Sequence, residues 1–153
     1  MTIATRLAAF VIAAIMLCCP AFSQTSASRA ERELFAAVNE ARHAYRLSPL
    51  RWDESLAAAA RRHAKIMAER GTAQHSFAGE PSLSARVKQE GAHFSWLSEN
   101  VTQGPTPSFI HTQFMQSSAH RANILDRDMD SIGIGVVELR GQLFVVEDLS
   151  QAR

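Results

Sequence analysis

The sequence has few cysteines, no long hydrophobic run and no excess of charge of one sign. Among 153 residues it contains two cysteines, 16 basic residues and 15 acidic residues, and the basic residues are scattered along the chain. A protein that follows the phosphate backbone of a nucleic acid needs a cluster of positive charge. We therefore expect no nucleic-acid partner. A chain of this length is typical of one domain.

The longest apolar run lies close to the N-terminus. Leu7–Leu17 has 11 residues, follows a basic residue and precedes the small residues around Ser23. An α-helix needs about 20 apolar residues to cross a bilayer, whereas this pattern is typical of a secretory signal peptide. We predict that residues 1–23 are a signal peptide cleaved near Ser23, and that the protein is secreted or periplasmic with no stable membrane anchor. A lipoprotein anchor on Cys18 or Cys19 is the alternative, which the residues preceding each cysteine disfavour.

Cleavage near Ser23 would remove both cysteines. The remaining 130 residues carry no thiol, so they have no disulfide, no thiolate nucleophile and no cysteine ligand for a metal. Cysteine-based catalysis is excluded, and the stability of the domain must come from packing.

Apolar periodicity and capping residues predict about four helices in the mature chain. Residues 24–30 are small or polar and are predicted to be a disordered lead-in, so that the domain spans residues 31–150. The helices are expected at about 32–46, at 54–70 between an Asp53 cap and Gly71, at 83–90 after a Ser82 cap, and at 107–116 after Thr106.

The period changes in the last quarter of the chain. Isoleucine and glycine alternate over Ile132–Gly135, and Arg140-Gly141 separates this run from Leu143–Val146, which predicts a β-hairpin. Glu99–Gln103 is a third predicted strand. Helices followed by a small antiparallel sheet indicate an α+β fold with helices covering the sheet.

Two local patterns for metal binding fail. No histidine pair forms the His-Glu-x-x-His motif of a helical metalloprotease. Asp126–Asp130 imitates the start of a calcium loop, but Ser131 and Val137 stand where that loop needs glycine and glutamate. We expect a solvated acidic turn there, and we regard the glycosylation sequon at Asn100 as incidental.

Four stretches that follow one another in a fixed order carry a family resemblance. The most specific is His120-Arg121-Ala122-Asn123-Ile124-Leu125 followed by Ile132-Gly133-Ile134-Gly135; the others are 38–42 with 47–53, His75-Ser76, and Ser98-Glu99-Asn100-Val101. Together they resemble the CAP superfamily of cysteine-rich secretory, antigen 5 and pathogenesis-related 1 proteins, in its compact bacterial form. The resemblance spans about residues 34–149 and implies a three-layer α-β-α sandwich with a central cleft.

The resemblance also implies which residues line that cleft: His75, Ser76, Glu99, Asn100 and His120. His75 and His120 match the two family histidines, and Glu99 matches the glutamate of the Gly-Glu-Asn motif.

The sequence departs from the family pattern at three positions near these residues. Ser98 and Ala119 replace family glycines, and Ser117 stands where animal members carry a second glutamate. We therefore expect a site of three residues rather than four.

Two interpretations of His75, Glu99 and His120 stay open. Two imidazoles and one carboxylate suit a divalent cation such as Zn²⁺. The same three side chains can equally form a hydrogen-bonded cluster that fixes the packing of helix on sheet.

The other histidines and the large aromatic residues are expected to have structural or surface roles. His63 lies on the inward stripe of its helix and is predicted to be a core histidine with satisfied hydrogen bonds. We place His43, His93 and His111 on the surface, and we expect Trp52, Phe94 and Trp96 to pack in the protein, with a lipid or glycan groove as the alternative.

The preferred function is a secreted binding module whose cleft holds a divalent metal, a small ligand, a lipid or a cell-envelope component without turnover. Ser76 has no Gly-x-Ser-x-Gly context and no identified aspartate behind a histidine, so a serine hydrolase is disfavoured. The alternatives are a metal-dependent peptidase or esterase, in which His75 and His120 hold the metal, and a purely structural protein.

Overall fold

A computed structural model of the chain describes residues 27–152, so the predicted signal peptide lies outside the described residues. Five helices and four strands follow one another in this part: α1 (Arg29–Ala44), β1 (Arg51–Trp52), α2 (Glu54–Arg70), α3 (Leu83–Gln89), β2 (Phe94–Gly104), α4 (Pro107–Gln116), α5 (Ser118–Ile124), β3 (Ser131–Leu139) and β4 (Gln142–Ala152). None of these helices has the length and apolar character needed to cross a bilayer. The α+β class predicted from the sequence is confirmed.

The four strands form one sheet in the order β1-β3-β4-β2. β3 and β4 are the predicted hairpin, with Arg140 and Gly141 in the turn at positive φ, and β2 pairs antiparallel with β4 along the far edge. β1 pairs in parallel with β3, so the sheet is mixed rather than wholly antiparallel as predicted. A strand of two residues is too short to show a period in the sequence.

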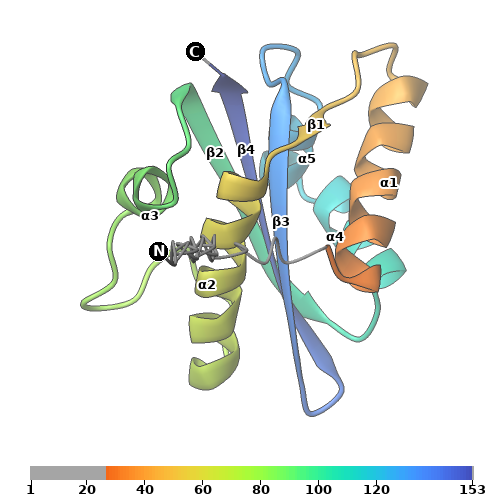
Figure 1. The fold of residues 1–153 in the computed structure, drawn as a ribbon. Helices are drawn as coiled ribbons and strands as arrows, with labels where there is room; N and C mark the ends of the chain where they lie inside the picture. Colours follow the sequence, from red (N-terminus) through yellow and green to blue (C-terminus); the bar gives the residue numbers. More distant parts are fainter. Residues whose placement is uncertain (1–26, 153) are drawn as a thin grey trace, which may run out of the picture.

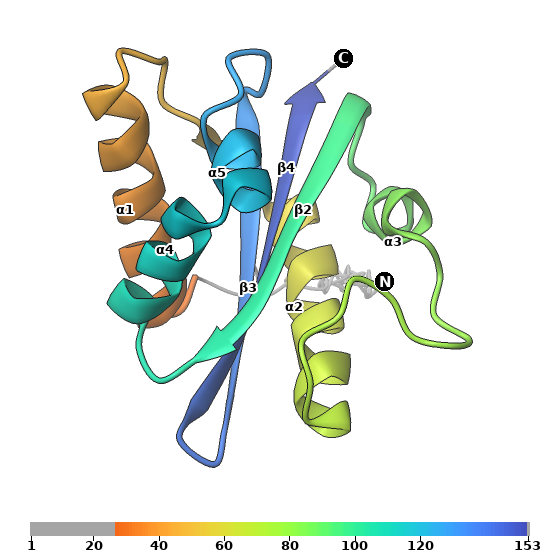
Figure 2. The same ribbon diagram turned by 180° about the vertical axis from the view of Figure 1, so that it is seen from behind.

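Helices cover both faces of the sheet, which gives the three layers that the resemblance implies. Figure 1 shows α2 and α3 on the near face, and Figure 2 shows α4 and α5 on the opposite face with α1 beside them. Apolar side chains of α1, α4 and α5 pack on residues such as Ile132 and Val145, and those of α2 pack on Val101, Phe144 and Val146. Neighbouring residues of a strand therefore face different layers.

The glycines of the Ile-Gly-Ile-Gly run allow α2 to lie directly on β3. A Cβ atom added at Gly133 would lie 2.0 Å from the backbone nitrogen of Ala57, and one added at Gly135 would lie 2.2 Å from the carbonyl carbon of Ala60. Both distances are far below van der Waals contact. The close approach of the α2 backbone to the β3 backbone therefore explains why glycine alternates with isoleucine in this run.

The predicted helix boundaries hold for α2 and α4 and shift elsewhere. Asp53 caps α2 and Gly71 ends it in a left-handed conformation, while α3 ends one residue earlier than predicted. α1 begins at Arg29, capped by Ser28 and Glu31, so the end of the segment predicted as a disordered lead-in belongs to the helix. Residues 24–26 of that segment lie outside the described residues.

The fifth helix, α5, was not predicted. It has seven residues, and the side chain of its N-cap residue, Ser117, makes no capping hydrogen bond. Its last turn is held instead by Arg42 of α1, a buried side chain that donates to the carbonyl oxygens of Ile124, Asp126 and Met129. Contacts across the fold stabilise this helix, so local sequence signals for it are weak.

Candidate functional site

Glu99 lies on the edge strand β2, on the face covered by α2 and α3, and its side chain is almost completely buried. Its Oε1 accepts a hydrogen bond of 2.8 Å from Nδ1 of His75, and its Oε2 is bound by the guanidinium of Arg86 from α3. His75 itself lies in the connection between α2 and α3, and 61% of its side chain is exposed. Glu99 thus orients a surface imidazole whose Nδ1 donates, and whose Nε2 is the nitrogen with an available lone pair.

His120 approaches from the other face of the sheet, on α5. Burial lowers the pKa of His120, and the imidazole of His75 is close enough to lower it further. Its ring also packs edge-on against Phe114 at 5.1 Å between ring centroids. Because β2 is the edge of the sheet, residues from both faces can meet beside it, and Figure 2 shows β2 lying between α5 and α3.

Asn100 holds α5 against the edge strand. Its Nδ2 donates to the carbonyl oxygen of His120 at 3.2 Å and to Oε2 of Glu147 at 3.1 Å, and its Oδ1 accepts from Asn123 at 2.8 Å. Asn100 is fully buried. Its role is therefore to position His120, and its burial leaves the sequon without an accessible asparagine.

The structure joins His75 to Glu99 by a hydrogen bond and links the backbone of His120 to Asn100, the residue after Glu99, while Ser76 has no such contact among the described residues. Ser76 is exposed, and within residues 27–152 its hydroxyl makes no hydrogen bond to a histidine. It lacks the base that a serine nucleophile needs.

A group of buried charged side chains behind Glu99 was not predicted from the sequence. We call Arg86, Glu80, His63 and Asp148 the charged layer. Arg86 is 2% exposed and contacts Glu99, Oε1 of Glu80 at 3.5 Å and the carbonyl oxygen of His75 at 3.3 Å. A basic residue in a seven-residue helix carries no sequence signal for such a role. Arg86 places a buried positive charge against Glu99 and fixes the position of its carboxylate.

His63 is fully buried in this layer, as predicted, and both its ring nitrogens face acceptors. Nδ1 lies 2.6 Å from Oε1 of Glu80, and Nε2 lies 2.8 Å from the carbonyl oxygen of Gln74. A carboxylate and a carbonyl oxygen both accept hydrogen bonds, so these two contacts hold the ring of His63 in place from both sides. Nε2 also lies 4.0 Å from Oε2 of Glu99.

Asp148 completes the layer from β4, where it pairs in register with Glu99. It is fully buried, and its carboxyl group lies against that of Glu99. Burial, together with the negative charge of Glu99, raises the pKa of Asp148 well above its ordinary value, although Arg86 opposes the shift. Burial and the neighbouring carboxylate thus favour the protonated form of Asp148.

Glu147, the preceding residue, is buried on the opposite face. Burial raises its pKa to about 7, and the hydrogen bond from Asn100 reduces the shift. An acidic pair inside an apolar strand, at residues 143–149, was the one sequence signal that could have drawn attention to these two carboxyls.

Some of the atoms that could bind a metal at this site already have partners in the protein. Within the described part of the chain, no group of three or more histidine, aspartate or glutamate side chains is arranged to hold a metal ion. Both oxygens of Glu99 are engaged by His75 and Arg86. Glu99 therefore lies behind His75 as a residue that positions the imidazole, and it is not arranged as the third metal ligand that the sequence analysis expected.

The acidic turn before β3 behaves as the sequence analysis expected. The backbone nitrogen of Asp128 donates to Oδ1 of Asp126 at 2.9 Å, which closes a local turn. Asp128 is exposed and Asp126 is half-buried.

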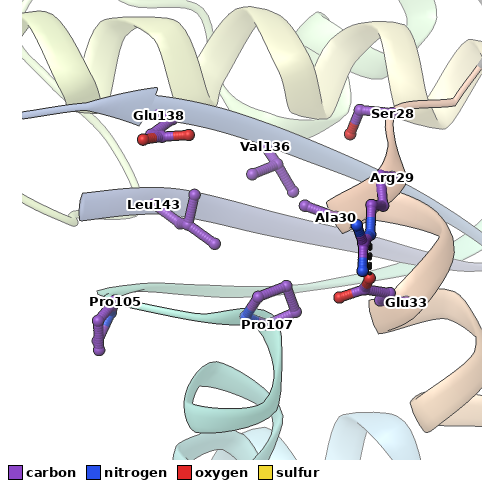
Figure 3. A pocket seen from close by; sticks show the side chains of 9 residues that line it. All are labelled: Ser28, Arg29, Ala30, Glu33, Pro105, Pro107, Val136, Glu138 and Leu143. Carbon is purple, nitrogen blue, oxygen red and sulfur yellow. Dashed lines mark hydrogen bonds and ion pairs between the residues drawn. The ribbon is translucent and has the colours of Figure 1, made fainter. Parts of the chain in front are cut away.

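A surface cavity of about 500 Å³ lies away from the predicted site, between the start of α1, the β3–β4 hairpin and the connection before α4. Figure 3 shows the ion pair of Arg29 and Glu33 at its rim and Glu138 on β3. Its lining residues are Ser28, Arg29, Ala30, Glu33, Pro105, Pro107, Val136, Glu138 and Leu143. None of the predicted cleft residues is among them.

The remaining histidines and aromatic residues divide between core and surface. Trp52 packs edge-on against Phe35 and donates from Nε1 to Glu54, so the prediction that it packs in the protein is confirmed. The same prediction is wrong for Trp96, which is 63% exposed. His111 is half-buried rather than on the surface, because it lies between α1 and α4, and burial lowers its pKa. His43 and His93 are exposed, as predicted.

A comparison of the sequence with models of known protein families gives a match over most of the chain. The model of the cysteine-rich secretory protein family, CAP, matches residues 35–149. The chain belongs to the CAP family.

Individual CAP relatives are distant. An uncharacterized protein of Bacillus subtilis (strain 168), YkwD, is 30% identical over 115 residues, which are 74% of this chain and 45% of that protein. The chain thus spans less than half the length of this relative.

Two solved CAP structures share the fold at low sequence identity. An extracellular protein with an SCP domain from Bacillus anthracis str. Ames has a TM-score of 0.74 at 22% identity, over 80% of this chain and 40% of that one. An outer surface protein of Borrelia burgdorferi also has a TM-score of 0.74, at 20% identity, over 84% of this chain and 96% of that one.

Proposed function

We propose that this CAP protein is a non-catalytic binding module that acts outside the cytoplasm, and that its ligand engages the imidazoles of His75 and His120. The observation that carries the proposal is the hydrogen bond that fixes His75 against Glu99, on the strand whose next residue, Asn100, binds the backbone of His120. The hydrogen bond from Nδ1 to Glu99 directs Nε2 of His75 away from the protein, toward a ligand.

Zn²⁺ is the divalent cation that we choose as the ligand to test. Neutral imidazole is the form that binds metal, and the lowered pKa of His120 favours that form at neutral pH. Histidine whose second nitrogen donates to a carboxylate is the usual arrangement in zinc sites. Bound zinc would supply positive charge for anionic or carbonyl groups of a ligand, while Glu99 and Arg86 hold the first imidazole in place.

The proposal of binding without turnover is supported by what surrounds the two histidines. Glu99, the carboxylate nearest to them, is tied to Arg86 and His75, so it is not free to take a proton from water. Ser76 lacks a hydrogen-bonded base within the described residues. A small molecule or a cell-envelope component that engages the same imidazoles fits the same proposal.

Export is part of the proposal and is supported by the short apolar run at residues 7–17. We expect the protein isolated from outside the cytoplasm to begin near residue 24. Mass spectrometry of its intact mass measures this directly. A chain that keeps residues 1–23 and fractionates with the membrane would contradict the proposed location.

Calorimetric titration of the mature, untagged domain with Zn²⁺ tests the site. We expect His75→Ala and His120→Ala each to weaken binding by roughly tenfold or more, because each removes one of two ligands. His93→Ala removes an exposed histidine elsewhere and should leave the affinity unchanged.

Two results would contradict this account. Equal zinc affinity in all three variants would place the metal elsewhere. Hydrolysis of a peptide or ester that is lost in both His75→Ala and His120→Ala, with unchanged melting temperatures, would establish a hydrolase instead of a binding module.

A further inference from the structure

Trp96 is the most exposed large apolar side chain among the described residues, and it lies where the edge strand is irregular. The pairing of β2 with β4 passes from Phe94 opposite Ala152 to Trp96 opposite Gln151, so Ser95 is an extra residue in the ladder. Such a bulge redirects the side chains next to it. Trp96 is 63% exposed. Exposing an indole costs free energy, which favours a role in contact with something outside the fold.

Trp96 lines a surface cavity of about 320 Å³. The other lining residues are Ser95, Asp126, Asp128 and Gln151, all polar. The Ser95 hydroxyl donates to Oε1 of Gln151 at 2.9 Å. That bond fixes the side-chain amide so that its NH₂ group remains as a donor, beside two carboxylates that accept.

The loop that carries the two carboxylates is held rigidly. Arg42 donates to the carbonyl oxygens of Asp126 and Met129, and the backbone of Asp128 donates to the Asp126 side chain. The acidic wall therefore keeps its position relative to the strand that bears Trp96. A preformed cavity costs less ordering on binding than a flexible loop does.

We propose that this cavity binds a pyranose ring of a neutral glycan. A pyranose presents a flat face of C–H groups that stacks on an aromatic ring, and a rim of hydroxyls that need both donors and acceptors. Trp96 supplies the stacking surface, the carboxylates of Asp126 and Asp128 accept from hydroxyls, and the Gln151 amide donates to them. The site is separate from the histidine pair and does not depend on zinc.

Other classes of ligand would use fewer of the groups that line this cavity. An organic cation would be served by the indole face and the carboxylates, with no use for the Gln151 donor. An anionic membrane surface would be repelled by the two carboxylates. The mixture of donor, acceptors and aromatic face is what a sugar requires.

The chain contains only two tryptophans, so NMR of the indole N–H groups reads the site directly. We expect cellotetraose or chitotetraose, added to the ¹⁵N-labelled mature domain, to shift the indole signal of Trp96. The signal of Trp52 should stay in place, because its Nε1 is bonded to Glu54 inside the protein. Titration of the shift gives the affinity.

Variants distinguish binding at this cavity from binding elsewhere on the protein. Trp96→Ala should weaken binding by on the order of tenfold or more, and the double variant D126N/D128N should weaken it while keeping the fold. Phe109→Ala, which removes another exposed aromatic side chain, should have no effect. Because Trp96→Ala lacks the indole, backbone amide shifts around Gln151 are its readout, and the same shifts are followed in Phe109→Ala for comparison.

Three outcomes would overturn the proposal. The first is no shift at Trp96 with either tetrasaccharide. The second is a shift of Trp96 with tetramethylammonium or with anionic phospholipid vesicles but not with a sugar. The third is sugar binding that Trp96→Ala leaves unchanged.

Discussion

At the scale of single residues, the site depends on how buried charged groups are paired. Arg86 lies between Glu99 and Glu80, and His63 contacts Glu80, whereas Asp148 is buried beside Glu99, which raises its pKa. Removing Arg86 would leave buried negative charge without compensation, which is among the most destabilising changes that a core can suffer. The rigidity of His75 is therefore a property of the whole charged layer.

Glu147 gives a pH dependence whose sign follows from its raised pKa. Its pKa is about 7 in the folded chain and 4.5 ordinarily, so the folded state holds a proton that the unfolded state has lost. Its contribution to the free energy of unfolding is therefore largest below about pH 4.5 and falls until about pH 7.

Glu147→Gln should remove this pH dependence. The glutamine can still accept from Asn100 but never ionises, so we expect roughly 3 kcal/mol more stability than wild type at pH 8 and little difference at pH 4.5. Urea unfolding at the two pH values measures it. Glu138→Gln, at an exposed position of β3, is the control. The same gain at both pH values would show that ionisation of Glu147 is not the cause.

At the scale of elements, the fold depends on how closely α2 lies on β3. The glycines at 133 and 135 leave no space for a side chain, and α2 in turn carries His63 into the charged layer. The position of the site thus depends on a backbone contact that lies outside it.

Gly135→Ala should destabilise the protein by about 3 kcal/mol or more, because its methyl group would overlap the backbone of Ala60 and Arg61. Gly104→Ala is the matched comparison. Its methyl group would meet mainly the ring of Phe109 at 2.6 Å, and this half-exposed ring can turn away, so the loss should be smaller. Thermal unfolding of both variants gives the order. A loss at Gly104 equal to or larger than that at Gly135 would contradict the proposed contact.

At the scale of the whole molecule, the elements with strong local signals were predictable. The caps at Asp53 and Thr106, the Gly71 stop and the Arg140-Gly141 turn are local chemistry, and each is observed. β1 and α5 were missed because contacts with β3 and with Arg42, distant in sequence, stabilise them.

The candidate site was predictable only in part. The motif order named His75, Glu99 and His120, and among these the structure joins His75 to Glu99 by a hydrogen bond. The contacts of Arg86 and Asp148 come from a helix position and a register that no local pattern encodes. Asn100 was named as a cleft residue, and its buried amide connects α5 to β2 and β4. The sequence therefore named candidate residues, whereas the contacts that position them depend on the fold.

The most direct test of the central claim is a crystal structure of the mature domain with Zn²⁺, in which anomalous scattering locates the metal. We predict a zinc peak bound by Nε2 of His75 and by His120, with Glu99 still accepting from Nδ1 of His75 and still bound to Arg86. A zinc ion coordinated by Glu99 in place of Arg86 would contradict the orienting role of that carboxylate. Absence of a peak at these two histidines, while zinc occupies another part of the protein, would contradict the proposed site.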